Sequence, residues 1–264
     1  SILWAGVIIS SFFLIARIWI RIRILHRFQA DDIFVISSWL LALANAAIWQ
    51  AIWPQLYLTI DIGSGRLTQY PANLIQQMET FLRGNYSAYV LSYTSLWSVK
   101  MSFLFFFRGL GEKIRSQRIL WWCVLAFIVA SYAVCIGTLD YICLFASGTD
   151  IIKKCSGHRA IWYEYITLRL ATSLDVVTDF MIIVLSANIV MRVHIDLRKK
   201  LALLGICSLT AFIITITIVR VVVATDGKIL DLSWLILFQG AELSVAIIVA
   251  CLATFRTLYT MSKR

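Results

Sequence analysis

Seven long apolar segments separated by short polar stretches dominate this 264-residue chain. Each is long enough to cross a membrane as a helix, which takes about 20 residues at a rise of 1.5 Å per residue. They cover residues 2–22, 33–57, 86–107, 119–141, 165–190, 201–224 and 232–255. Because the backbone hydrogen bonds of such a segment must close within it, and because alternating ten-residue segments are lacking, the pattern predicts an all-α, seven-transmembrane helix bundle.

Composition agrees with a membrane protein. The chain is 61% hydrophobic and 14% charged, whereas ordinary soluble domains are about 45–50% apolar and about 25% charged. A soluble protein of this size could not bury so much apolar surface. We therefore expect one domain over residues 1–264, in contact with the lipid bilayer of the plasma membrane or an endomembrane. The polar stretch before the third segment reads as an amphipathic helix at 74–83 that lengthens this span.

The net charge of +10 comes from 24 lysines and arginines against 14 acids. In a soluble protein this excess would indicate a nucleic-acid partner, but here most bases stand in short clusters between the spans. Fifteen flank the spans on one side and six on the other. The positive-inside rule then places the C-terminus in the cytosol and the N-terminus outside, and no nucleic-acid partner is expected.

Ionisable side chains stand where lipid should exclude them. Each ionised group at the centre of a span costs about 2.5–3.5 kcal/mol, so such groups are expected to pair or to face a polar cavity. Lys100 and Asp179 lie at matching depths, about 21 Å from the outer ends of their spans at 1.5 Å per residue. Asp175 shares a helix face with Asp179. The six residues of this kind are Lys100, Arg169, Asp175, Asp179, Arg220 and Glu242.

Three roles remain open for this network, in which we expect Lys100, Asp179 and Glu242 to tie three helices together. It could be a structural latch, a ligand contact or switch, or a catalytic acid and base. Arg220 and Arg169 are shallower, and their side chains can also extend to the membrane surface.

Two spans carry aromatic faces at helical spacing. Opposed to each other, these faces would line an outward-facing pocket with a few polar groups. The alternative is an aromatic packing seam that continues into an interfacial belt. The third span contributes Tyr86, Tyr89, Tyr93 and Trp97, ending at Lys100, and the second contributes Asn45, Trp49, Trp53 and Tyr57.

The sequence predicts no cofactor and no metal. The seventh span has no lysine for a retinal Schiff base, and no cysteine and histidine have the spacing of a zinc site. Cys143 and Cys155 fall on the predicted outer side, 12 residues apart, where the oxidising environment permits a disulfide. Free thiols are the alternative, since spacing alone does not fix disulfide geometry.

Several short motifs, in this order along the chain, resemble the fungal rhodopsin-domain integral membrane family, which includes receptor-like proteins of plant-pathogenic fungi. The resemblance spans nearly the whole chain. It rests on Asp31-Asp32, Lys100-x-Ser102 followed by Phe105-Phe106-Phe107-Arg108, the pair Cys143 and Cys155, Thr178-Asp179, Arg198-Lys199-Lys200, Arg220, Glu242, Cys251 and Arg256. It implies seven helices, a receptor-like role and coupling to a heterotrimeric G protein.

The chain departs from this family in its prolines. Prolines usual in the family are replaced near Leu144, Ser186 and Ala253, and helices without proline should be straighter.

Two functions from different classes follow, beside the plain alternative of a structural or assembly protein. The first is a receptor-like sensor whose outward-facing aromatic pocket binds a small hydrophobic or amphipathic ligand through Lys100, Trp97, Tyr93, Tyr89, Asn45, Trp49, Asp179, Glu242 and Arg220. The alternative is a membrane-embedded cyclase or isomerase that acts on a hydrophobic metabolite, with Asp179, Asp175 or Glu242 as the acid.

Overall fold

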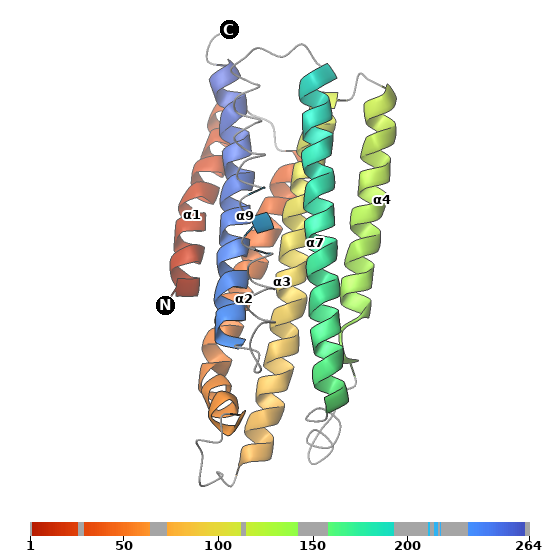
Figure 1. Ribbon diagram of the computed structural model, residues 1–264. Helices are drawn as coiled ribbons and strands as arrows, with labels where there is room; N and C mark the ends of the chain where they lie inside the picture. Colours follow the sequence, from red (N-terminus) through yellow and green to blue (C-terminus); the bar gives the residue numbers. More distant parts are fainter. Residues whose placement is uncertain are drawn as a thin grey trace.

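Long helices running up and down make up the computed structural model (Figure 1). It describes residues 2–25, 29–63, 73–111, 115–141, 158–192, 211, 214–215, 217 and 232–261. Within these ranges the regular structure is entirely helical: α1 (Ile2–Ile20) with a π-helical turn η1 (Arg21–Leu25), α2 (Ala30–Gly63), α3 (Leu74–Gly111), α4 (Arg115–Gly137), α7 (His158–Arg192) and α9 (Leu232–Met261). Six of these helices are long and apolar enough to span a membrane, which makes the chain a multi-pass integral membrane protein.

The helices extend beyond most of the predicted spans. The predicted amphipathic helix at 74–83 forms the first turns of α3, so the two make one continuous helix of 38 residues. The helix α7 runs without a break through Ser186, and α9 through Ala253, as expected where proline is missing. The helix α4 ends at Gly137, short of the predicted boundary.

Three sequence-based expectations fall wholly or mostly outside the described residues. Of the sixth predicted span, 201–224, the structure describes only positions 211, 214, 215 and 217, so the count of seven helices stays a prediction. Cys143 and Cys155 both lie outside the described residues, and so does Arg220. The orientation in the membrane also stays a prediction, and we name the two ends of the bundle by it: outer for the end where α1 begins, cytosolic for the end where α9 finishes.

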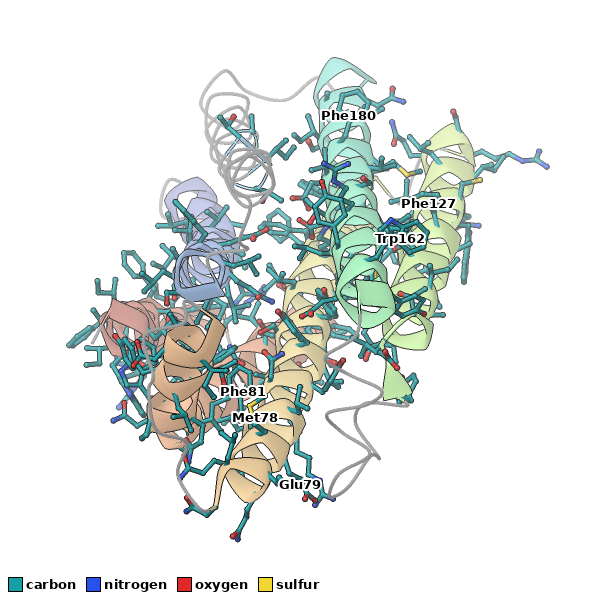
Figure 2. The ribbon with its side chains drawn as sticks, turned by 60° about the horizontal axis from the view of Figure 1, so that its bottom comes forward. Met78, Glu79, Phe81, Phe127, Trp162 and Phe180 are labelled. Atoms are coloured by element: carbon teal, nitrogen blue, oxygen red, sulfur yellow. The ribbon has the colours of Figure 1, made fainter. Side chains whose placement is uncertain are left out.

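The helix α3 is the centre of the bundle. It contacts α2, α4, α7 and α9. In its most apolar stretch 67% is buried inside the bundle, against 22% for α1 and 28% for α4. Its outer extension is held by α2, because Phe81, which Figure 2 labels on α3, packs in one cluster with the buried Ile52 and Leu56. Buried side chains of α3 can therefore be contacted by side chains from several helices.

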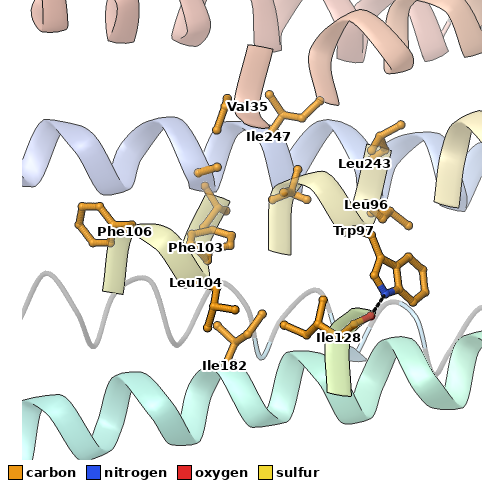
Figure 3. Close-up of a cluster of buried hydrophobic side chains, with 14 of the residues drawn as sticks. Val35, Leu96, Trp97, Phe103, Leu104, Phe106, Ile128, Ile182, Leu243 and Ile247 are labelled. Carbon is orange, nitrogen blue, oxygen red and sulfur yellow. Dashed lines mark hydrogen bonds between the residues drawn. The ribbon is translucent and has the colours of Figure 1, made fainter. Parts of the chain in front are cut away.

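Apolar side chains from five helices pack around α3 in the main core. Figure 3 shows Leu96 and Phe103 of α3 beside α9, with Leu104 directed toward α7. The helices α1 and α9 approach closely at two glycines, since a Cβ on Gly6 would meet the Ser244 hydroxyl and one on Gly240 would meet Leu3. Exposed apolar residues such as Phe12, Trp162 and Phe180 cover the outside of the bundle, as expected of a surface that faces lipid.

Candidate functional site

Lys100 is the centre of a buried charge cluster between α3 and α7. Its ammonium lies 2.7 Å from a carboxylate oxygen of Asp175 and 3.0 Å from one of Asp179. It also donates hydrogen bonds to the Thr178 hydroxyl, at 2.6 Å, and to the backbone carbonyl of Asp175, at 2.8 Å. The predicted pairing of Lys100 with Asp179 is present, and Asp175 joins it. We call Lys100, Asp175 and Asp179 the lysine cluster.

Helix geometry explains how α7 presents these groups together. Residues three and four apart share one face of a helix, so Asp175, Thr178 and Asp179 all face α3. On α3, Trp97 lies one turn before Lys100, and the ammonium stands 5.1 Å from the centroid of its ring. The indole nitrogen of Trp97 donates to the backbone carbonyl of Ile128 on α4 (Figure 3). Three helices thereby hold one lysine.

The lysine cluster has one cation and two carboxylates. All three residues are at most 8% exposed. In a medium of low dielectric, two carboxylates this close are both ionised only if enough positive charge is near. The site is therefore suited to hold a second cation or a proton, and that is the chemistry it offers.

A small pocket opens at the outer end of the same helices. It has a volume of about 30 Å³. Three of its tyrosines come from α3, a fourth tyrosine and an acid come from α7, and a second acid follows α4. The residues in this order are Tyr86, Tyr89, Tyr93, Tyr163, Glu164 and Asp140. We call this the tyrosine pocket, and its lining of tyrosines and acidic residues is suited to a cation.

A second, deeper pocket continues from the tyrosine pocket toward the lysine cluster. Its volume is about 10 Å³, and it shares Tyr93 and Leu168 with the outer one. Trp97, Asp175 and Gln239 also line it. The lining of the two pockets thus runs from the outer end of the bundle down to a carboxylate of the lysine cluster.

The helix α2 does not face the tyrosine pocket, so the idea of two opposed aromatic faces is wrong. Trp49 packs instead in an apolar cluster with Phe81 and Ile236, and Trp53 and Tyr57 are exposed on the outside of the bundle. Asn45 is buried, and its carbonyl oxygen has no hydrogen-bond partner in the described part of the chain. The aromatic face of α3 meets α4 and α7 because α2 packs along the other side of α3.

Glu242 is held separately from the lysine cluster. Its carboxylate accepts a hydrogen bond of 2.8 Å from the Thr217 hydroxyl, whereas the ion pairs of Lys100 within the described chain run to α7. The expected network of three helices is therefore a link between α3 and α7, with Glu242 on α9 bonded elsewhere. Arg169 is exposed and stacks on Tyr165, its guanidinium carbon 4.3 Å from the ring centroid.

A second buried charge cluster was missed by the sequence analysis. Arg17 of α1 and Arg21 of η1 each pair with Asp31 and with Asp32 at the start of α2, at distances of 2.7–3.1 Å. All four side chains are 2% exposed. We call these four residues the arginine cluster. Arg17 and Arg21 are two of the fifteen bases counted on the predicted cytosolic side, and both are buried and paired with carboxylates rather than exposed in a loop.

The arginine cluster ties four helices at the cytosolic end. Arg17 also donates to the backbone carbonyl of Ala250 on α9, and the Ser102 hydroxyl of α3 donates to the carbonyl of Asp31. A signal was present in the sequence: two arginines four residues apart share a helix face, and an acidic pair follows within one short connection. Within the described ranges, no group of three or more histidine, cysteine and acidic residues could hold a metal ion.

The comparisons with known proteins agree with the motifs. The model of the fungal rhodopsin domain matches residues 16–261, nearly the whole chain. No curated protein and no solved structure matches this chain. The matched segment includes both charge clusters and the tyrosine pocket. The chain is therefore a member of the fungal rhodopsin domain family.

Proposed function

We propose that this protein is a receptor-like sensor whose tyrosine pocket binds the cationic head group of a small amphipathic ligand from the outside. The observation that carries the proposal is the continuous lining that leads from this pocket to Asp175 of the lysine cluster. Membership of the fungal rhodopsin domain family supports a receptor-like role.

The lining of the pocket supports a cation. Four tyrosines and two acidic residues line it, while no base stands among the described residues of the lining. Ammonium groups bind to aromatic faces with about 0.5–2 kcal/mol per contact, more when water is excluded. A volume of about 30 Å³ gives room for roughly two waters. It would therefore take a small head group, with the rest of the ligand outside.

Tyr93 would pass the effect of binding inward. It lines both pockets, its ring lies edge-on to Trp97 with centroids 6.1 Å apart, and Trp97 carries the ammonium of Lys100 on its face. A cation in the outer pocket would move Tyr93 and add positive potential near an acid-rich cluster. Such coupling requires that the ligand binds one arrangement of α3 and α7 better than another.

The alternative of a membrane-embedded enzyme requires an enclosed cavity beside an acid. The cavity at Asp175 has about 10 Å³, which is room for about one water and not for a hydrophobic substrate. The sensor is the function that these dimensions favour.

The test is to measure the thermal unfolding midpoint of the detergent-solubilised full chain with n-butylammonium chloride as the probe. We expect n-butylammonium to raise the midpoint, and equal concentrations of sodium chloride or n-butanol to leave it unchanged. Tyr86→Leu and Glu164→Gln should each weaken the apparent affinity about three- to tenfold.

Tyr57→Leu is the matched control, since Tyr57 is an exposed tyrosine of α2 toward the same end that does not line the pocket. A response of equal size to n-butanol would contradict the proposal, as would an equal loss of response in Tyr57→Leu.

Three further elements of the proposal concern the complete receptor. The family resemblance implies a heterotrimeric G protein as the cytosolic partner, the base count implies that the tyrosine pocket faces outside, and Cys143 and Cys155 would form a disulfide. Each has its own test: nucleotide exchange on a purified G protein, labelling of cysteines introduced at either end, and mass spectrometry of the unreduced chain.

A further inference from the structure

A further cavity lies at the other end of the bundle and has no part in the proposed sensor. Its volume is about 320 Å³, and it is formed where α3 ends, α4 begins and α7 ends. This volume is in the range of small-molecule sites. Among its lining residues, Phe107, Leu185 and Ile189 make an apolar side.

A buried amide marks the polar side of this cavity. Gln117 lines it and is only 3% exposed, yet neither its nitrogen nor its oxygen has a hydrogen-bond partner in the described part of the chain. A buried amide without a partner costs about 1–3 kcal/mol. A polar group of a ligand in this cavity would supply the missing hydrogen-bond partners, because the amide can both donate and accept.

Two arginines stand beside this amide. Arg108 ends the matched motif of α3, and its guanidinium carbon lies 5.0 Å from the ring centroid of Trp121, which orients it. Arg118 lies one residue beyond Gln117 on α4. No described residue of the lining is acidic. Arginines next to a neutral donor are the arrangement that binds phosphate oxygens, because the planar guanidinium donates in a fork.

We propose that this cavity binds an anionic phospholipid of the membrane leaflet around the cytosolic end. Its phosphate would lie between Arg108 and Arg118, with one oxygen accepting a hydrogen bond from the Gln117 amide, and an acyl chain would lie along Phe107 and Leu185. The base count assigns this end to the cytosol, where anionic lipids are enriched. The site lies outside the tyrosine pocket and does not depend on its function.

The surroundings favour a lipid over a soluble phosphate. Trp122 lines the cavity and is 56% exposed, and Ile119 next to Arg118 is 60% exposed. Both are on the first turns of α4, at the level where tryptophans mark the boundary between head groups and acyl chains. A cavity open there, with an apolar side, admits a chain and a head group together, whereas inorganic phosphate would fill only its polar side.

The experiment compares three probes on the detergent-solubilised full chain. Dioctanoyl phosphatidic acid should raise the thermal unfolding midpoint, whereas dioctanoyl phosphatidylcholine and inorganic phosphate at equal concentrations should leave it nearly unchanged. Arg108→Gln and Arg118→Gln should each weaken the apparent affinity for phosphatidic acid about tenfold. The matched control is Arg115→Gln, because Arg115 begins the same helix, is exposed and does not line the cavity.

Gln117→Leu separates binding from folding. Removing an unsatisfied buried amide should raise the midpoint of the lipid-free protein, because the amide has no partner to lose. The same variant should respond less to phosphatidic acid. A purely structural role for Gln117 predicts the opposite sign for the first measurement.

Three results would overturn the proposal. An equal shift with phosphatidylcholine would show that only the chains bind, and an equal shift with inorganic phosphate would assign the site to a soluble phosphate. Loss of the response in Arg115→Gln to the same degree as in Arg118→Gln would show unspecific attraction to a basic surface.

Discussion

The two buried charge clusters of this protein use the same kinds of groups in different proportions. The arginine cluster has two cations and two carboxylates in mutual contact, while the lysine cluster has one cation for two carboxylates. The first adds bonds to α3 and α9. The second lies beside a cavity that continues to the outer end of the bundle.

This difference indicates a structural role for the arginine cluster and a ligand-responsive role for the lysine cluster. A balanced set of charges with all its bonds made has nothing to gain from another ion, and it loses stability when any member is removed. A set with an excess carboxylate has an energetic reason to attract a cation. We infer that the arginine cluster fixes the arrangement of helices at one end, and that the lysine cluster responds to what binds at the other.

The largest effect is expected when the balanced cluster loses a member. Arg17→Met should lower the free energy of unfolding by about 3–5 kcal/mol, because it leaves a buried carboxylate uncompensated. Arg23→Met is the control, since Arg23 lies in η1, which directly follows α1, and is exposed, and it should change stability by less than about 0.5 kcal/mol. Titration with SDS measures both. If the free energy of unfolding of Arg17→Met changed by less than about 1 kcal/mol, the structural role of the arginine cluster would be contradicted.

The unbalanced cluster should respond unequally to the loss of its cation and of one acid. Lys100→Met leaves two carboxylates together and should lower the free energy of unfolding by about 3 kcal/mol. Asp179→Asn leaves the Lys100–Asp175 pair in place and should lower it by about 1 kcal/mol. The same titration compares them. Equal losses would mean that the second carboxylate is as necessary to the fold as the lysine.

Trp97 tests how the lysine cluster is attached to α4. Trp97→Phe removes the indole donor to the carbonyl of Ile128 and weakens the contact of the ring with Lys100. We expect a loss of about 1–2 kcal/mol in the free energy of unfolding. Trp19→Phe, at a 59% exposed tryptophan of α1, should be close to neutral. If Trp97→Phe left the free energy of unfolding unchanged, Trp97 would not be what connects the lysine cluster to α4.

A buried hydrogen bond between uncharged groups gives the smallest effect and the baseline for both clusters. The Ser95 hydroxyl of α3 donates to the backbone carbonyl of Ser38 on α2 at 2.7 Å. Ser95→Ala should lower the free energy of unfolding by about 1 kcal/mol, the usual value of one hydrogen bond. If Ser95→Ala were as damaging as Arg17→Met, charge would not be what distinguishes the clusters.

Much of the fold could be predicted because span length and polarity are local properties. The helical class, the extension of α3 and the matching depth of Lys100 and Asp179 all follow from counting residues along helices. Which helix faces which does not follow from such counting. The aromatic faces of α2 and α3 each have the right period, and only packing shows that Trp49 meets Phe81 while Tyr93 faces α4 and α7.

The arginine cluster shows a second limit. Arg17 and Arg21 stand at the end of a span, where the positive-inside rule explains basic residues without any partner. The rule describes averages over loops and does not distinguish an exposed base from one paired with the next helix. The pair Asp31-Asp32 was the local signal for the latter. Glu242 was linked to Lys100 through depth alone, and depth does not give the direction of a side chain around the helix axis.

The most direct test of the account asks whether the lysine cluster senses the tyrosine pocket. Asp179 belongs to the cluster and lines neither pocket. The measurement is the apparent affinity for n-butylammonium, taken from the thermal unfolding midpoint, in Asp179→Asn and in Ser95→Ala, two variants expected to have similar stability. The account predicts a loss of about three- to tenfold in Asp179→Asn alone, which corresponds to the usual size of coupling between sites. An unchanged affinity in Asp179→Asn would contradict it.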